Sequence, residues 1–223
     1  MIPLSNVMLF QKHSIKHPQI VKYYTHWTDS LTKPGSPLTD EIPWLNYGAI
    51  DWLDKKTNST TDVFEWGSGG STLFLSKRAR SVVTIEHNPK WYGYVCQALV
   101  SRNVQNVSIH LVEGKALAKS KKAYLSTDMD SIGKSFSDYA SSIDKFPDST
   151  FDIVIVDGRA RNHCINHAIS KIKTGGHLIL DNAERDEYQA GIQIIDHWPQ
   201  EAFTCPGPYL DYPWTTKIWT NIF

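Results

Sequence analysis

Apolar and polar residues follow a regular rhythm along most of the chain after residue 61. The segment DVFEW (62–66) is a short apolar run typical of a buried strand, and STLFLSKRA (71–79) has helical spacing. A strand over 81–87, a helix over 89–102 and a strand over 107–113 follow in the same way. Strands and helices that alternate at these lengths predict right-handed β-α-β units in a mainly parallel sheet.

The same rhythm returns after residue 150. FDIVIVDG (151–158) is a continuous apolar run, as expected of a central strand. The pattern then predicts a helix over 159–173 that stops at Gly175 and Gly176, a strand over 177–182, a helix over 184–198, and a terminal hairpin within 202–223. The second half of the chain therefore continues the α/β pattern of the first half.

Two segments break the rhythm. Residues 1–43 lack sustained periodicity, so we predict an irregular or partly helical N-terminal arm, with the main domain spanning 44–223 and opening with a helix up to residue 56. Residues 114–150 are rich in Ser, Lys and Asp, with a plausible helix over 137–146. An interruption of this length is typical of a lid, a binding loop or an insertion, and it carries a cluster of lysines: Lys115, Lys119, Lys121 and Lys122.

Composition narrows the class of protein. With 223 residues and 41% hydrophobic content, the chain can form one globular domain with a short appendage. Lys plus Arg and Asp plus Glu both number 23, which argues against nucleic acid as the partner because no overall basic field exists. The apolar run Val7–Phe10 is too short for a signal peptide or a membrane span, so we expect a cytoplasmic protein that does not enter a membrane. The oligomeric state is left open.

The turn EWGSGGS (65–71) follows the first strand of the sheet. Ligands of open α/β sheets bind beyond the carboxyl ends of the strands, so this turn is the first place to look for a site. Gly67 and Gly69 let the backbone turn tightly and approach a ligand without a Cβ in the way. Ser68 or Ser71 can cap the following helix, and the free amides can bind an anionic group.

The residues around the turn discriminate between nucleotide ligands. A P-loop would end in Gly-Lys-Ser/Thr, and a dinucleotide turn would have glycine at position 72, where this chain has Thr72. Glu65, at the end of the strand, would repel a diphosphate but would attract an ammonium and a sulfonium group. S-adenosylmethionine fits this pattern better than NAD(P).

The next strands end in further acidic residues. Glu86 can accept hydrogen bonds from both hydroxyls of a ribose, in the manner shared by adenosyl ligands. Glu113 is placed for the adenine region, and His87 either lies beside the adenine or has a structural role. A solvated carboxylate at a strand end is the alternative for both glutamates.

The motifs FEWGSGGS, TIEH, FDIVIVDG and GGHLILDN resemble, in order and spacing, those of class I S-adenosylmethionine-dependent methyltransferases. The resemblance covers residues 44–223. It implies a Rossmann-like seven-stranded sheet, mainly parallel with an antiparallel last strand and helices on both faces. It also implies S-adenosylmethionine as the cofactor.

Methyl transfer requires an aligned acceptor and removal of its proton. Asp157 follows the fourth strand, and Asp181 with Asn182 follows the fifth, so three oxygen donors would meet at one edge. Such donors suit Mg²⁺ or Mn²⁺, which would lower the pKa of a bound hydroxyl. The set is similar to the metal site of catechol and caffeoyl-CoA O-methyltransferases. An acidic residue that binds no metal is the alternative.

The general base is not assigned by this resemblance. Those enzymes have a lysine three residues after the first aspartate, where this chain has Ala160. His163 and Asp157 are candidate bases. Arg159 joins them as a catalytic candidate, and it and Arg161 can either clamp a substrate carboxylate or phosphate or form an ion pair with Asp157.

Aromatic residues border the same edge. Trp44 and Tyr47 precede the sheet and, with Arg161, are the candidate substrate-binding residues; ordinary packing is the alternative. The sequence thus predicts O-methylation of a hydroxyl on a small molecule or glycan, with or without a divalent cation. The alternatives are an NAD(P)-dependent oxidoreductase and a non-catalytic methyltransferase-like binding domain.

Overall fold

The computed structural model describes residues 4–117, 124–125 and 131–223. Lys119, Lys121 and Lys122 of the predicted lysine cluster lie outside the described residues. The elements, in chain order, are α1 (Leu4–Lys16), η1 (Pro18–Tyr23), α2 (Tyr24–Thr32), α3 (Pro37–Asp40), α4 (Tyr47–Lys56), β1 (Asp62–Trp66), α5 (Gly70–Ser76), β2 (Ser81–Glu86), α6 (Pro89–Ser101), β3 (Val107–Leu111), β4 (Lys115–Ala116), β5 (Lys134–Ser135), α7 (Ser137–Ala140), η3 (Ser141–Lys145), β6 (Phe151–Val156), α8 (Arg161–Ala168), η4 (Ile169–Lys171), β7 (Ile172–Leu180), η5 (Asp186–Tyr188), α9 (Gln189–Ile195), β8 (Gln200–Cys205) and β9 (Trp214–Thr220).

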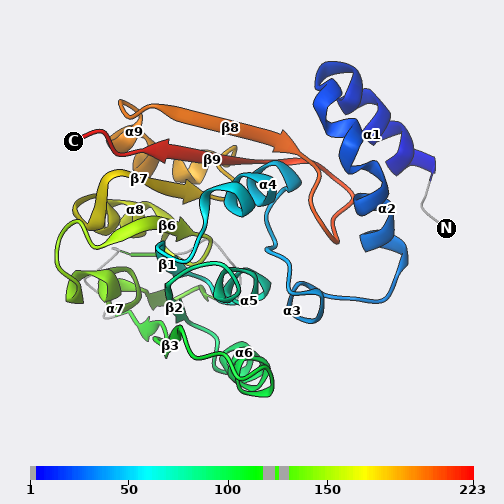
Figure 1. Cartoon of the computed structure of the whole chain (residues 1–223). Helices are drawn as coiled ribbons and strands as arrows, with labels where there is room; N and C mark the ends of the chain where they lie inside the picture. Colours follow the sequence, from blue (N-terminus) through cyan, green and yellow to red (C-terminus); the bar gives the residue numbers. More distant parts are fainter. Residues whose placement is uncertain (1–3, 118–123, 126–130) are drawn as a thin grey trace.

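Seven strands form one twisted sheet in the order β3-β2-β1-β6-β7-β9-β8 (Figure 1). All neighbouring strands from β3 to β7 run parallel, whereas β9 runs antiparallel to both β7 and β8. The predicted fold class, including the antiparallel last strand and the terminal hairpin, is confirmed. A separate two-stranded ribbon, β4-β5, forms within the predicted insertion.

Helices cover both faces of the sheet. One core packs α7, α8 and α9 against one face, and a second core packs the arm, α4 and α5 against the other. Strand β6 contributes to both, because Val154 and Val156 enter the first core while Ile153 and Ile155 enter the second. Burial on both faces explains why this strand reads as an unbroken apolar run.

The predicted glycine stop after the helix over 159–173 is wrong. Helix α8 ends at Ala168, and Gly175 and Gly176 lie inside β7. Gly175 adopts φ +79°, and its N–H donates to the Asn221 carbonyl at 2.7 Å, while the Asn221 N–H donates to the Gly176 carbonyl at 2.8 Å. The glycine pair therefore belongs to an irregular part of β7, where the register with β6 shifts and the backbone pairs with Asn221.

The N-terminal arm is mainly helical and packs onto the same core as α4. Phe10 stacks on Trp27 with ring centroids 4.9 Å apart, and the Trp27 Nε1–H donates to the Leu210 carbonyl at 2.9 Å. Figure 1 shows α1 and α2 beside the end of the sheet where the β8–β9 connection turns. Among the described residues, no helix has the length and apolar character needed to cross a membrane.

Candidate active site

The carboxyl ends of β1, β2, β6 and β7 lie side by side and carry the predicted site residues. Trp66, the last residue of β1, pairs with Ile85 of β2 and with Val156 of β6. Val156 in turn pairs with Leu180 of β7. This register brings the turns after the four strands to one edge of the sheet, as expected from the sequence.

The glycine turn fits tightly between its neighbours. Gly67 has φ +98°, and a Cβ on it would lie 2.8 Å from the Asp157 carbonyl oxygen. Its N–H donates to the Ile85 carbonyl at 2.9 Å. Gly67 therefore meets both a conformational and a steric requirement that other residues do not.

A tryptophan that the sequence reading missed covers the turn. The Trp91 Nε1–H donates to the Ser68 carbonyl at 2.7 Å, and a Cβ on Gly69 would lie 3.6 Å from the ring. Asn88 caps the helix that carries this ring, because its side chain accepts from the backbone N–H groups of Lys90 and Trp91. The only available signal was the place of Trp91 in the first turn of a helix that follows an acidic strand end.

Glu65 lies beneath the turn and has no exposed surface. Its Oε2 accepts from the hydroxyls of Thr72 at 2.6 Å and Thr84 at 2.9 Å. Burial raises the pKa of Glu65, although the hydroxyls of Ser71, Thr72 and Thr84 act to lower it. Its other oxygen, Oε1, is buried and has no hydrogen-bond partner among the described residues. An orphaned acceptor beside a glycine turn fits a ligand that supplies a donor.

Glu86 is 2% exposed and fixes the turn from the second strand. Its Oε2 accepts from the N–H and the hydroxyl of Ser68, and its Oε1 accepts from the N–H groups of His87 and Asn88. Burial acts to raise the pKa of Glu86, but these hydrogen bonds outweigh it and hold the pKa below its usual value. The predicted ribose contact remains a prediction. A ribose hydroxyl that binds Glu86 would replace one of these donors.

His87 and Arg159 extend this network across the site. The Arg159 Nε–H donates to His87 Nε2 at 3.1 Å, and His87 Nδ1 lies 3.1 Å from Glu86 Oε1. The pair thus connects the turn after β6 to the strand end of β2. Glu113, which follows β3, is exposed, and its predicted adenine contact remains a prediction.

The two aspartates predicted at the acceptor end differ in their surroundings. The Asp157 side chain is 29% exposed, and burial raises its pKa to about 6 while Arg161 acts to lower it. Asp181 is 3% exposed, and burial, reinforced by the charge of Asp157, raises its pKa to about 7. The Asp181 Oδ1 accepts from Trp214 Nε1 at 2.8 Å and from the Thr216 hydroxyl at 2.6 Å. Asp157 is therefore the accessible carboxylate of the two.

The Arg161 guanidinium contacts two of the three side chains that the sequence assigns to a metal ion, those of Asp157 and Asn182, and the backbone carbonyl of the third residue, Asp181. Its Nη2 is 2.9 Å from Asp157 Oδ1, and its Nη1–H donates to the Asp181 carbonyl at 2.7 Å and to Asn182 Oδ1 at 3.4 Å. Within the described ranges, no group of three His, Cys, Asp or Glu side chains is placed to hold a metal ion. Because a cation already sits among these donors, the donor set does not fit Mg²⁺ or Mn²⁺.

His163 is engaged by the insertion. Its ring stacks on Tyr124 with centroids 4.0 Å apart, and its Nε2 accepts from the Tyr124 N–H at 3.2 Å. Burial lowers the pKa of His163. The nitrogen that would take a proton from an acceptor is thus already used, which disfavours His163 as the base.

The aromatic candidates divide into exposed and buried groups. Trp44 is 49% exposed, whereas Tyr47 is 6% exposed and stacks on Tyr23 with centroids 5.3 Å apart. Tyr47 also lines a cavity of about 510 Å³ between the arm and residues 208–209. Substrate contact by Trp44, Tyr47 or Arg161 remains a prediction.

No protein-family model and no curated protein matches this chain. Several solved structures match its fold. They include a proposed O-methyltransferase from Klebsiella pneumoniae (TM-score 0.59, 15% identity, covering 87% of this chain and 94% of that one). They also include an rRNA methylase from Streptococcus thermophilus (TM-score 0.55, 12% identity, covering 78% of this chain and 95% of that one). A third is a proposed methyltransferase from Streptococcus mutans in complex with SAH (TM-score 0.53, 14% identity, covering 76% of this chain and 94% of that one). The chain has the fold of these methyltransferases.

In this methyltransferase fold, the arm packs directly against the glycine turn. A Cβ on Gly70 would lie 2.1 Å from the Pro37 carbonyl oxygen and 2.2 Å from that of Ile42. Backbone of the arm therefore rests on the first turn of α5. The arm borders the predicted cofactor site as well as the core.

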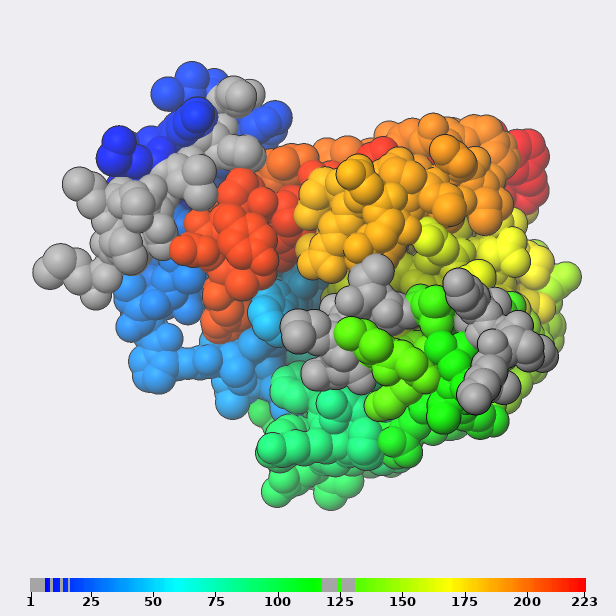
Figure 2. Space-filling view, turned by 180° about the vertical axis from the view of Figure 1, so that it is seen from behind, coloured from blue at the N-terminus to red at the C-terminus, as the bar shows by residue number. Residues whose placement is uncertain are grey.

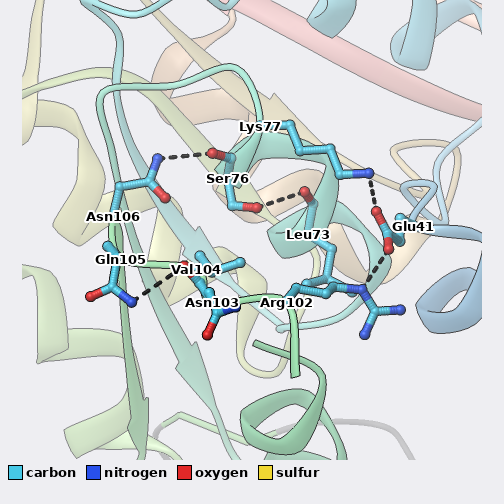
Figure 3. Close-up of a pocket in the computed structure, with 9 residues that line it drawn as sticks. All are labelled: Glu41, Leu73, Ser76, Lys77, Arg102, Asn103, Val104, Gln105 and Asn106. Atoms are coloured by element: carbon cyan, nitrogen blue, oxygen red, sulfur yellow. Dashed lines mark hydrogen bonds and ion pairs between the residues drawn. The ribbon is translucent and has the colours of Figure 1, made fainter. Parts of the chain in front are cut away.

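Ion pairs hold the arm in this position from the opposite end of α5. Glu41 pairs with Lys77 and with Arg102 (Figure 3). The pairs border a cavity of about 560 Å³ at the C-terminal ends of α5 and α6, lined by Glu41, Leu73, Ser76, Lys77, Arg102, Asn103, Val104, Gln105 and Asn106. Since residues 103–106 precede β3, this cavity lies away from the carboxyl edge and from the predicted site residues.

Proposed function

We propose that this chain is an S-adenosylmethionine-dependent methyltransferase that methylates a hydroxyl group of a small molecule or glycan. The observation that carries the proposal is the orphaned Oε1 of Glu65 beneath the glycine turn. The charged Glu86 lies beside the same turn. A charged Glu86 and a second acidic side chain, Glu65, at this place disfavour the diphosphate of NAD(P) and favour a ligand that bears an ammonium and a sulfonium group.

The residues of the turn fit this cofactor. S-adenosylmethionine, when bound, supplies an activated methyl group on a sulfonium. Gly67 and Gly69 leave the turn without a Cβ at two positions on either side of Ser68, and Ser71 stands half-buried at the start of α5. Glu86 is charged and adjoins the turn, as a residue that orients a ribose must.

Asp157 has the properties of the base. It stands at the carboxyl edge with its side chain partly exposed, and its pKa of about 6 lies near neutral pH, where a general base works best. In the proposed reaction, an oxygen–carbon bond forms as the carbon–sulfur bond breaks, and the electron pair stays on sulfur. The hydroxyl proton passes to the Asp157 carboxylate.

The acceptor class follows from charge. Numbers of acidic and basic residues are equal over the chain, which favours an acceptor other than a polyanion. Because structures with this fold include an rRNA methylase, RNA belongs in the test as a competing acceptor. Figure 2 shows the molecule from behind, where the arm and the C-terminal connection stand beside each other at one end.

The test is transfer of labelled methyl groups from S-adenosylmethionine to hydroxyl-bearing small molecules, glycans and RNA, each with EDTA present. We expect label in a hydroxyl acceptor, and loss of that label in Asp157→Asn. Asp196→Asn, a change at an exposed carboxylate after α9, is the matched control and should retain transfer. Label in RNA alone would overturn the acceptor class, and binding of NAD⁺ without any transfer would overturn the proposal.

A further inference from the structure

We propose that the guanidinium of Arg161 is the resident cation of the acceptor site and positions Asp157 and Asn182 for methyl transfer without a divalent metal ion. The inference rests on the proposed function, because it concerns the acceptor end of the same site. It assigns Arg161 as a positioning residue that acts through Asp157.

The contacts of Arg161 are those of a cation in an oxygen cage. Its Nε–H donates to the Gly158 carbonyl at 3.0 Å and its Nη1–H to the Asp181 carbonyl at 2.7 Å. Nη1 also reaches Asn182 Oδ1, and Nη2 pairs with Asp157 Oδ1. These oxygens come from the turns after two adjacent strands, β6 and β7. A guanidinium satisfies all of them at once because it carries five N–H donors in a rigid plane and is always charged.

The same contacts occupy oxygens that a divalent cation would need as ligands. Oδ1 of Asp181 is held by Trp214 and Thr216, and the pair Asp157–Asn182 faces the guanidinium. An ion placed between them would lie within a few ångströms of a fixed positive charge in a poorly solvated place, where repulsion is strong. Arg161 and a metal ion are therefore alternatives for one position.

Arg161 is built into this position. It is 8% exposed, and its guanidinium carbon lies 5.1 Å from the centre of the Tyr188 ring, which is itself buried. It is also the first residue of α8, so its backbone is fixed by the helix. Moving the side chain aside would leave Asp157 and the Asp181 carbonyl without their cation, which makes displacement by a metal ion costly.

The test begins with the wild-type protein and needs no acceptor. Binding of Mn²⁺ is measured by the loss of the free-ion signal in electron paramagnetic resonance, and binding of S-adenosylhomocysteine is measured by calorimetry on the same sample. We expect S-adenosylhomocysteine to bind and Mn²⁺ not to bind at this site. Mn²⁺ binding that Asp157→Asn abolishes would overturn the inference while leaving the proposed function intact. Absence of S-adenosylhomocysteine binding would instead count against the proposed function.

Variants then test the role of the guanidinium. In Arg161→Ala we expect Mn²⁺ affinity to rise by at least about tenfold, because the oxygens lose their cation. We expect methyl transfer to fall, with partial rescue by methylguanidinium or by the conservative variant Arg161→Lys. Arg80→Gln, which removes an arginine paired with Asp62 at the other end of β1, is the matched control and should not gain Mn²⁺ binding. Methyl transfer that is unchanged in Arg161→Ala and indifferent to methylguanidinium would overturn the positioning role.

Discussion

The indole N–H of Trp91 donates a hydrogen bond to the Ser68 carbonyl oxygen at 2.7 Å, so that a ring from α6 closes over the glycine turn after β1. The turn carries the residues through which we expect the cofactor to bind. Its conformation therefore depends on a residue that is distant in sequence. The relationship gives the first prediction.

Replacing Trp91 should weaken cofactor binding. In Trp91→Ala the turn loses both its hydrogen bond and its cover, so we expect the affinity for S-adenosylhomocysteine to fall by about tenfold in calorimetry. Trp91→Phe keeps the ring and should lose less. Val100→Ala, a change at an exposed apolar residue near the other end of the same helix, is the control and should keep the wild-type affinity. Equal affinities for wild type and Trp91→Ala would refute this role.

Asp181 should make folding stability depend on pH. Its pKa rises from 3.8 to about 7 in the folded protein, so the folded state binds the proton more tightly than the unfolded state. Its contribution to stability is therefore full below pH 4 and is lost as the pH rises toward 7. Asp181→Asn can still accept from Trp214 and Thr216 but carries no charge. We expect it to raise the free energy of unfolding at pH 8 by on the order of 2 kcal/mol.

The measurement is denaturant unfolding of both proteins at pH 5 and pH 8. The advantage of Asp181→Asn should be much smaller at pH 5, where the wild-type carboxyl is largely protonated. An advantage that grows as the pH falls would contradict the assignment.

The contact between the arm and the glycine turn should appear in a pair of glycine substitutions. Gly70→Ala places a Cβ against two backbone carbonyls of the arm, which must then move. We expect a loss of about 2–4 kcal/mol in the free energy of unfolding, with faster proteolysis near residues 33–36. Gly93→Ala is the control, because a Cβ there meets nothing within 4 Å on helix α6. It should stabilise the protein by about 0.5–1 kcal/mol.

Separate substitutions of Asp157 and His163 should show which of them is the general base. Since the Nε2 of His163 already accepts from the Tyr124 N–H, His163→Gln should leave methyl transfer within about threefold of wild type. Asp157→Asn should reduce it by about 10²–10⁴-fold, the usual range for loss of a general base. The measurement is the rate of methyl transfer by each variant and by the wild type, with the same acceptor and saturating cofactor. The reverse order of effects would assign the base to His163.

The sheet and its carboxyl-edge residues were predictable because they follow local patterns. The unbroken apolar run of β6 reflects burial on both faces. The acidic residues Glu65, Glu86, Asp157 and Asp181 each lie at the carboxyl end of a recognisable strand or directly after it. The start of α6 at residue 89 was predictable for the same reason, since its capping by Asn88 is a local interaction.

Features that depend on distant contacts were not predictable. Gly175 and Gly176 look like a helix stop, but their conformation is set by pairing with Asn221 far along the chain. The orientation of Arg161 was left open, because both a substrate clamp and an ion pair suit an arginine at that position. The structure pairs Arg161 with Asp157 and packs it on Tyr188, and its contact with a substrate remains a prediction.

The identity of the cofactor is tested most directly by calorimetry with S-adenosylhomocysteine and with NAD⁺ on the wild-type protein. We predict a binding heat with S-adenosylhomocysteine that is lost in Glu86→Ala, and none with NAD⁺. A binding heat with NAD⁺ and none with S-adenosylhomocysteine would contradict the account.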